Sequence, residues 1–145
     1  MKLSNEWFSA LSTAENGNLI IVSGREELDE FKACQKLKER IEIYWKYEGD
    51  EKGMPTDAEA ELMETVQEKL QKVMEKDKLA ILTGVYTGDK ERTLVFYART
   101  SRVFGERLNE ALAEFDLLPI SLYVEMDEEW DEYTDMYEMK EFEIE

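Results

Sequence analysis

The chain has 145 residues, of which 43% are hydrophobic and 37% are charged, and its formal net charge at pH 7 is −17. This length and apolar content are typical of one globular domain with its own core, and they exclude a disordered polypeptide. There is no histidine and only one cysteine, Cys34, which excludes imidazole metal ligands, histidine-dependent nucleophiles and an internal disulfide. We therefore expect no metal or other cofactor. Enzymatic activity stays an open question, with the balance against it.

The charge and the sequence of the first residues bear on partners and location. An acidic surface repels the phosphates of nucleic acids and of anionic lipids. Residues 1–5 are not followed by the apolar region of a signal peptide, and no stretch approaches the roughly 18 apolar residues of a membrane span. We expect a cytoplasmic protein with neither nucleic acid nor membrane as a partner.

Residues 6–24 predict an N-terminal β-hairpin. Asn16-Gly17 separates the apolar segments 7–11 and 19–22, and an Asn-Gly pair supplies the two positive-φ residues of a type I′ turn. Residues 25–38 have few apolar anchors and fit either a short helix or an irregular connection.

A strand and a helix follow. Residues 40–47 alternate between apolar and polar side chains, which is typical of a strand with one buried face. Thr56 begins a helix that extends to about residue 76, because Glu59 three residues later completes a capping box. We expect this helix to face the core with Leu62, Val66, Leu70 and Val73, flanked by Met63 and Met74.

Two strands, a helix and a last strand make up the second half. Residues 79–87 are apolar on both faces and predict a central strand, and a turn at 88–91 leads into an antiparallel strand over 93–99. A second helix begins at Ser101, and Pro119 prevents its continuation. Its apolar stripe is Phe104, Leu108, Ala111, Leu112 and Phe115, and the inward residues of the last strand are Ile120, Leu122, Val124 and Met126.

The βαββαβ order over residues 39–126 predicts a ferredoxin-like, two-layer α/β (α+β) sandwich with an antiparallel sheet, inside a single domain spanning residues 1–145. Both helices then pack on one face of the sheet. The other face is either open or covered by the hairpin or by an acidic C-terminal segment, residues 127–145, which we expect to form a short helix.

The open sheet face holds the residues that we select as candidates for binding a ligand or a partner. Alternation places Tyr44, Tyr97, Arg99 and Tyr123 there, beside Arg40, Lys46 and Glu125. Interleaved aromatic and basic residues stack bases in RNA-recognition modules, but the net charge disfavours RNA here. Packing beneath another element, a homodimer interface, or a site for a small ligand or peptide are the remaining alternatives.

The C-terminal segment carries most of the charge. Residues 125–145 contain eleven acidic residues and one basic residue, Lys140, so they contribute −10. Trp130, Tyr133 and Tyr137 recur at helical spacing and predict a stripe that anchors the segment, which makes Trp130 a further candidate. The carboxylates serve either solubility or attraction of a basic protein partner. Their spacing lacks the glycine turn and terminal glutamate of an EF-hand loop, so we assign no metal site.

Five short motifs carry a family resemblance: residues 53–55 (Gly-Met-Pro), 85–88 (Val-Tyr-Thr-Gly), 95–97 (Val-Phe-Tyr), 104–109 (Phe-Gly-Glu-Arg-Leu-Asn) and 127–130 (Asp-Glu-Glu-Trp). In this order and spacing the chain, from Trp7 to Tyr137, resembles the bacterial family called domain of unknown function 695. The resemblance implies no catalytic residues. The resemblance also implies relatives that are joined to a domain similar to the ribonuclease E regulator, itself a small acidic ferredoxin-like fold, and this context implies regulation or protein binding by analogy.

From the sequence we expect a protein of unknown function that acts as a non-enzymatic binding or regulatory module, through its acidic surface or its open sheet face. The alternative is an enzyme or ligand-binding protein that holds a small molecule on the open sheet face. An apolar pocket with convergent polar groups would favour the second reading, whereas a flat patch would favour the first.

Overall fold

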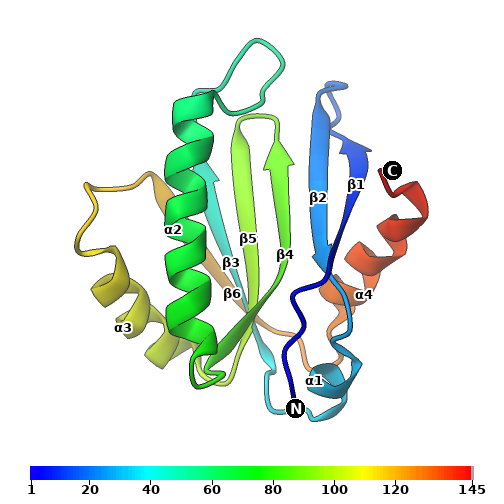
Figure 1. Ribbon diagram of the computed structural model, residues 1–145, viewed down its shortest axis with the longest axis vertical. Coiled ribbons are helices and arrows are strands. Elements are labelled where there is room, and N and C mark those ends of the chain that lie inside the picture. Colours follow the sequence, from blue (N-terminus) through cyan, green and yellow to red (C-terminus); the bar gives the residue numbers. More distant parts are fainter. Residues whose placement is uncertain (145) are drawn as a thin grey trace.

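The computed structural model describes residues 1–144 and contains one antiparallel sheet ordered β1-β2-β4-β5-β3-β6 (Figure 1). The fold is therefore mixed α+β with an antiparallel sheet, as predicted. The strands are β1 (Trp7–Thr13), β2 (Leu19–Arg25), β3 (Glu39–Lys46), β4 (Ala80–Gly88), β5 (Glu91–Ala98) and β6 (Ile120–Met126). The helices are α1 (Asp29–Ala33), α2 (Asp57–Glu75), α3 (Ser101–Leu112) and α4 (Asp131–Glu138), followed by a 3₁₀ turn at Met139–Phe142.

The N-terminal hairpin extends the sheet instead of covering one of its faces. β2 pairs with β4 from Ile20 opposite Gly88 to Gly24 opposite Gly84, and β1 lies outside β2. A Cβ on Gly88 would lie 2.2 Å from the carbonyl oxygen of Leu19, so glycine permits this close pairing. The sheet consequently has six strands, and as a whole it does not have the four-strand order of a ferredoxin-like sandwich.

The turn of this hairpin differs from the prediction. Among the residues of the loop only Gly17 has a positive φ, of 88°, whereas a type I′ turn needs two such residues. The Gly17 N–H donates to the Ala14 carbonyl at 2.9 Å, and the Ala14 N–H donates to the Asn18 carbonyl at 2.9 Å. The predicted type I′ turn is wrong because the loop is longer and needs one left-handed residue, which Gly17 supplies.

Helix α2 begins as predicted, but its buried face is rotated. The Thr56 hydroxyl accepts from the Glu59 N–H, and the Glu59 carboxylate accepts from the Thr56 N–H at 2.9 Å, which completes the capping box. The buried residues are Met63, Val66, Leu70 and Met74, whereas Leu62 is exposed and Val73 is only half-buried. The two methionines thus fill the core positions that we assigned to Leu62 and Val73.

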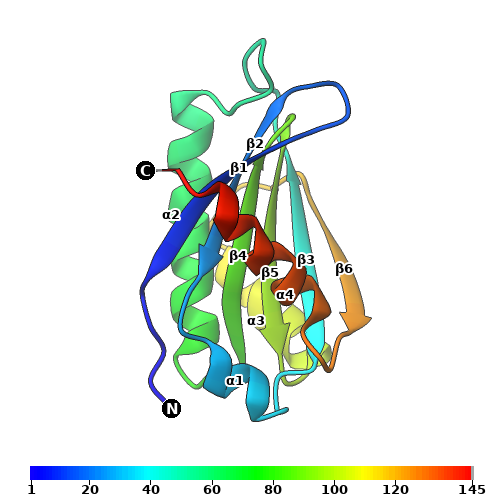
Figure 2. The same ribbon diagram turned by 90° about the vertical axis from the view of Figure 1, so that its right-hand side faces the viewer.

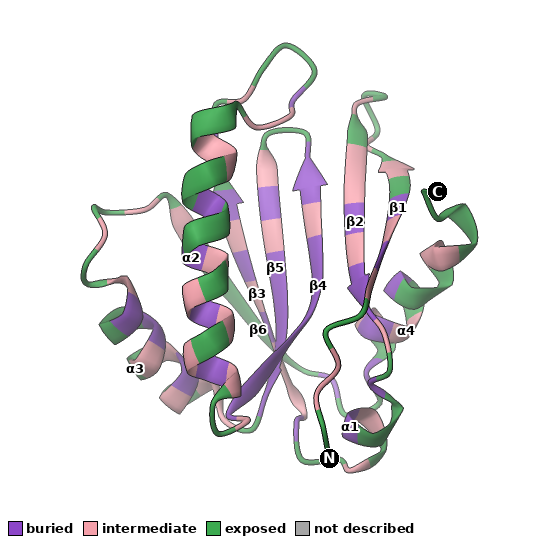
Figure 3. Ribbon diagram, viewed as in Figure 1, coloured by how far each residue is buried: buried purple, intermediate pink, exposed green. Residues whose placement is uncertain are grey.

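Helices α2 and α3 pack on one face of the sheet and form the first of two cores. Phe104, Leu108 and Ala111 of α3 are buried there, in agreement with the predicted stripe. The predicted inward face of β6 is largely exposed, because β6 is the edge strand beyond the cover of the helices (Figure 3). That part of the prediction is wrong for Leu122, Val124 and Met126.

The second core lies on the opposite face of the sheet. Helices α1 and α4 lie against it, and α4 crosses this face in Figure 2. Trp130, Tyr133 and Met136 are buried and Tyr137 is partly exposed, so the C-terminal segment is anchored by its aromatic stripe. This cover makes the molecule three layers thick over part of the sheet, where we expected two. No helix in residues 1–144 has both the length and the apolarity needed to cross a membrane.

Candidate functional site

The sheet face on which we predicted the binding residues is divided by α4 into a covered and an uncovered part. Tyr44 on β3 and Tyr123 on β6 lie in the uncovered part, half-buried and exposed respectively. Glu42 on β3 pairs with Tyr123, and Arg40 with Glu125. The structure therefore brings Tyr44 and Tyr123 onto one exposed surface but separates them from the other candidates.

Tyr97 and Trp130 are buried, so neither belongs to an open surface. Their rings stack with centroids 4.4 Å apart, beneath α4. The Tyr97 hydroxyl donates to Asp127 Oδ2 at 2.7 Å, and Trp130 Nε1 donates to the Leu37 carbonyl at 2.7 Å. Burial of large aromatic area drives this packing, and the two polar tips find partners inside it. Among the alternatives for this face, packing beneath another element is therefore the one that holds for Tyr97, and the residue is not displayed on an open surface.

Arg99 does not join the tyrosines either. β5 ends at Ala98, and Arg99 is an exposed residue beyond it whose guanidinium donates to the Asp77 carbonyl at 3.0 Å. The predicted strand extended one residue too far, so Arg99 was placed in a strand alternation that it does not share.

The uncovered part of this face is organised by Arg40. Its guanidinium donates to Asp127 at 2.7 Å, to Glu125 at 2.6 Å and to Glu42 at 2.8 Å, while the Tyr44 hydroxyl donates to Glu42 at 2.7 Å. Burial opposes ionisation of Arg40, but the hydrogen bonds that it donates to these carboxylates raise its pKa above the ordinary value. The donors of Arg40 and Tyr44 are thus already engaged within the protein, which leaves little for a ligand.

Asp127 links this network to α4. Its carboxylate also accepts from the backbone N–H groups of Asp131 at 2.9 Å and Glu132 at 3.2 Å, at the start of the helix. Burial raises its pKa, but the hydrogen bonds from Tyr97 and Arg40 outweigh burial and hold the pKa below its usual value. Asp127 is therefore an anion with a structural role. No group of acidic, histidine or cysteine side chains in residues 1–144 has the arrangement of a metal site.

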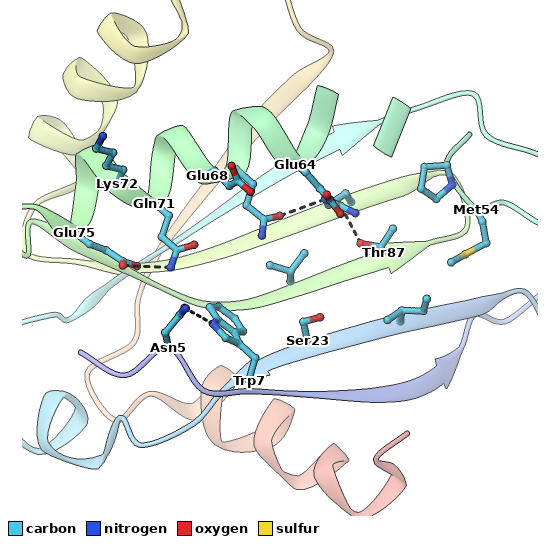
Figure 4. Close-up of a pocket in the computed structure, with 15 residues that line it drawn as sticks. Asn5, Trp7, Ser23, Met54, Glu64, Glu68, Gln71, Lys72, Glu75 and Thr87 are labelled. Carbon is cyan, nitrogen blue, oxygen red and sulfur yellow. Dashed lines mark hydrogen bonds between the residues drawn. The ribbon is translucent and has the colours of Figure 1, made fainter. Parts of the chain in front are cut away.

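A cleft of about 750 Å³ lies on the other face of the sheet, between α2 and the N-terminal hairpin (Figure 4). It arises because β1 and β2 extend the sheet past the part that α2 covers. In Figure 4 Gln71 and Glu75 of α2 project toward the sheet while Lys72 points away from it, and Trp7 and Ser23 project toward the helix. The floor is Ile21, Ser23, Val85 and Thr87, the wall is Glu64, Gln67, Glu68, Gln71, Lys72 and Glu75, and the ends are Asn5, Trp7, Met54 and Pro55.

Two cations line this cleft, Lys72 on α2, which is exposed, and Arg92 on β5, which is buried. The side chain of Arg92 points to the helix side of the sheet, and the residue is only 9% exposed. Nε donates to Thr87 Oγ1 at 3.0 Å and Nη1 donates to Gln67 Oε1 at 3.3 Å. Within residues 1–144 no carboxylate lies within 4 Å of the guanidinium, and Nη2 has no hydrogen-bond acceptor. Because Arg92 lines the cleft, its remaining N–H groups are free to donate to a bound acceptor.

The environment of Arg92 is energetically unusual. Burial lowers its pKa, since water is removed without an ion pair to replace it. A guanidinium nonetheless stays charged at neutral pH. Protein interiors normally pair a buried charge, so an unpaired one in a cleft is a property of binding sites rather than of cores.

A second arginine, Arg25, has a different role. Its guanidinium donates to Glu75 at 2.7 Å, and the same carboxylate accepts from the Leu82 N–H at 2.9 Å. The guanidinium also lies 5.2 Å from the centroid of the Trp7 ring. This buried pair joins the end of β2 to α2 and holds Trp7 in place, so it shapes the cleft without offering a free charge.

Hydrogen bonds between three loops stabilise the end of the cleft near Met54. Asp89, in the turn between β4 and β5, accepts from the side-chain amides of Asn16 and Asn18 at 2.9 Å each. The neighbouring Lys90 N–H donates to the Gly53 carbonyl at 2.9 Å. The hairpin tip, the loop before α2 and the β4–β5 turn are thereby held together, and this end of the cleft is preformed.

Sequence reasoning missed the cleft and its arginine. We placed the turn at 88–91 and began the strand at residue 93, which left Arg92 outside both. A signal was present, because Arg92 is in phase with Leu94 and Phe96, two core residues. A charged residue at a core-facing position in a strand is rare unless it is paired or functional. No comparable signal identifies Trp7, whose position depends on how the hairpin docks.

The comparisons with known proteins agree with the motif resemblance. No curated protein and no solved structure matches the chain significantly. A family model matches residues 5–137, which covers the sheet, all the residues that line the cleft and nearly all of α4. On this match the chain belongs to the family described as "Family of unknown function (DUF695)".

Proposed function

We propose that the protein is a non-enzymatic binding module that holds a small ligand in the cleft between α2 and the hairpin. The observation that carries the proposal is the buried guanidinium of Arg92, which has no carboxylate partner and lines the cleft. A bound carboxylate would supply the missing acceptor and the missing charge. The cleft thus replaces the open sheet face as the site, since the donors on that face are already engaged.

The charges around Arg92 indicate the ligand class. Glu64 and Glu68 are exposed on α2 above the floor of the cleft, one helical turn apart. The negative charge of Glu64 stabilises the charged form of Arg92. These carboxylates repel a polyanion and attract a cation. A small zwitterion, with a carboxylate toward Arg92 and an ammonium group toward Glu68, matches both signs. The ring of Trp7 and the side chains of Ile21 and Val85 can contact its apolar part.

The experiment compares three probes at matched ionic strength: β-alanine, acetate and ethylammonium. Fragments of this size bind weakly, so millimolar dissociation constants are expected. At about ten times the dissociation constant, the unfolding free energy rises by about 1.4 kcal/mol and the melting temperature by roughly 3–5 °C. We expect the largest rise with β-alanine, a smaller one with acetate and the smallest with ethylammonium.

Two matched arginine variants test the role of Arg92. Arg92→Met should abolish the rise produced by β-alanine, whereas Arg102→Met, at an exposed position on α3, should keep it. Because Arg92 is a buried charge without an ion pair, Arg92→Met should leave the stability of the free protein unchanged or higher. A β-alanine response that survives in Arg92→Met contradicts the proposal, and a large loss of stability assigns Arg92 a structural role instead.

Three further expectations extend the proposal. The strands β4-β5-β3-β6 have the order and antiparallel neighbours expected of a ferredoxin-like core, which supports relating residues 39–126 to that fold with the hairpin added at one edge.

The proposed location is the cytoplasm. The exposed carboxylates of Glu129, just before α4, and of Asp131 and Asp135 on α4 support a basic protein partner, whose capture should weaken as salt rises.

A further inference from the structure

The two edge strands of the sheet, β1 and β6, are covered to different extents. β1 is partly covered, because Ala10 bridges to Glu143 and the Ile144 N–H donates to the Ser9 carbonyl at 2.7 Å. β6 pairs with β3 alone within residues 1–144. Natural edge strands are usually protected by lysine, proline, a bulge or a short length. β6 has seven residues and none of these protective features.

The free edge of β6 presents apolar residues and unused backbone groups together. The Pro119 carbonyl accepts from the Lys46 N–H at 3.2 Å and the Asp127 N–H donates to the Lys38 carbonyl at 2.7 Å, so odd-numbered residues bond to β3. The N–H and C=O groups of Leu122, Val124 and Met126 therefore point outward. Their side chains are 44%, 46% and 59% exposed, and they lie on one face of the strand.

The order of residues in β6 is symmetric about its centre. Reading outward from Tyr123 in either direction gives an apolar, a polar and an apolar residue: Leu122, Ser121 and Ile120 on one side, and Val124, Glu125 and Met126 on the other. A strand with this pattern is complementary to a second copy of itself in the antiparallel direction. We propose that the protein forms a homodimer by pairing β6 with β6 of a second copy, about a two-fold axis at Tyr123.

This register satisfies the backbone geometry. Leu122 of one copy lies opposite Val124 of the second copy. The two residues exchange both N–H···O=C bonds, because their outward backbone N–H and C=O groups face each other. Tyr123 lies opposite Tyr123 of the second copy in a non-hydrogen-bonded pair, where side chains are closest and aromatic pairs are favourable. On the helix side, the apolar side chains of the two strands then form one continuous row across the seam.

The charges at the seam are compatible with two copies. Its one ionised residue, Glu125, is paired with Arg40 at 2.6 Å and lies opposite Ser121 of the second copy. The rest of the molecule repels its partner, since each copy carries −17. Raising NaCl from about 0.1 M to about 1 M shortens the Debye length from about 10 Å to about 3 Å. The dimer should therefore become stronger with salt, whereas docking of a basic partner should become weaker.

Sedimentation equilibrium of the full chain, from about 10 µM to about 1 mM, tests the proposal in the range expected for a small interface. We expect a reversible monomer–dimer equilibrium that shifts toward dimer as salt rises. Val124→Lys should weaken dimerisation by about tenfold or more, because it puts a desolvated charge at the seam. Leu11→Lys, an exposed leucine on the opposite edge strand, is the matched control and should leave the equilibrium unchanged.

Cysteine crosslinking tests the register, in a Cys34→Ser background. Two cysteines introduced by Tyr123→Cys would have Cα atoms about 4.5 Å apart, which suits a disulfide. In Ser121→Cys the two positions lie four residues out of register, about 13 Å apart and beyond reach. Mild oxidation should crosslink the first variant and not the second. A protein that stays monomeric at about 1 mM in about 1 M NaCl, or equal crosslinking of the two variants, overturns the proposal.

Discussion

Glu132 on α4 occupies the environment least suited to its charge. Its Oε1 accepts from the Tyr86 hydroxyl at 3.1 Å, while its Oε2 is buried without a hydrogen-bond partner in the described chain. Burial raises the pKa of this carboxyl to about 7, against an opposing contribution from the Tyr86 hydrogen bond. The charge of this side chain therefore changes in the region of neutral pH, and we expect its ionisation to weaken the contact between α4 and the sheet.

The pH dependence of stability follows from the sign of this shift. The pKa of about 7 in the folded protein exceeds the value of about 4.3 in an unfolded chain. The contribution of Glu132 is complete below about pH 4.3 and is lost as pH rises through about 7, by on the order of 1–3 kcal/mol. Glu132→Gln keeps an acceptor for Tyr86 and removes the ionisation, so its unfolding free energy should fall less between pH 5 and about pH 8.

Urea unfolding at several pH values measures this difference. Glu129→Gln removes a neighbouring carboxylate at an exposed position and serves as the control for net charge. Its pH profile should follow that of the unmodified protein. If Glu132→Gln and Glu129→Gln give the same profile, the buried carboxyl is not the cause of the pH dependence.

At the scale of secondary structure, the register of α2 offers a sharp comparison between two leucines on one helix. Leu70 is 1% exposed in the first core and Leu62 is 42% exposed. Leu70→Ala should cost about 2–5 kcal/mol through lost burial and a cavity, whereas Leu62→Ala should cost less than about 1 kcal/mol. Denaturant melts of the two variants measure both values, and equal losses would restore the leucine stripe expected from the sequence.

Elements with local signals were predicted well. The capping box of α2, the stripe of α3 and the aromatic stripe of α4 depend on residues within a few positions of one another, and the structure contains all three. The rotation of α2 was missed because Leu62 and Met63 are both apolar, and spacing alone does not decide which one faces the core. The turn at Gly17 was missed because Asn-Gly fits more than one loop length.

At the scale of the whole molecule, the candidate site depends on contacts between distant segments. The cleft exists because β2 pairs with β4, between 60 and 68 positions away in the sequence, and leaves the helix side of the hairpin uncovered. Nothing in the hairpin sequence identifies its partner strand. Similarly, alternation placed Tyr97 on the correct face of the sheet, but only the docking of α4 determines that this part of the face is buried.

We propose that ligand binding occurs in the cleft and not on the sheet face that the sequence favoured. The three tryptophans separate these sites: Trp7 lines the cleft, Trp45 lies in the first core and Trp130 lies under α4. A ¹H–¹⁵N NMR titration with β-alanine reports on all three indole N–H groups and on the backbone amides. We predict saturable shifts for the Trp7 indole and the amides of Ser23 and Gln71, with Trp130, Tyr44 and Tyr123 unmoved. Shifts at Tyr44 and Tyr123 with the Trp7 indole unchanged would contradict the account.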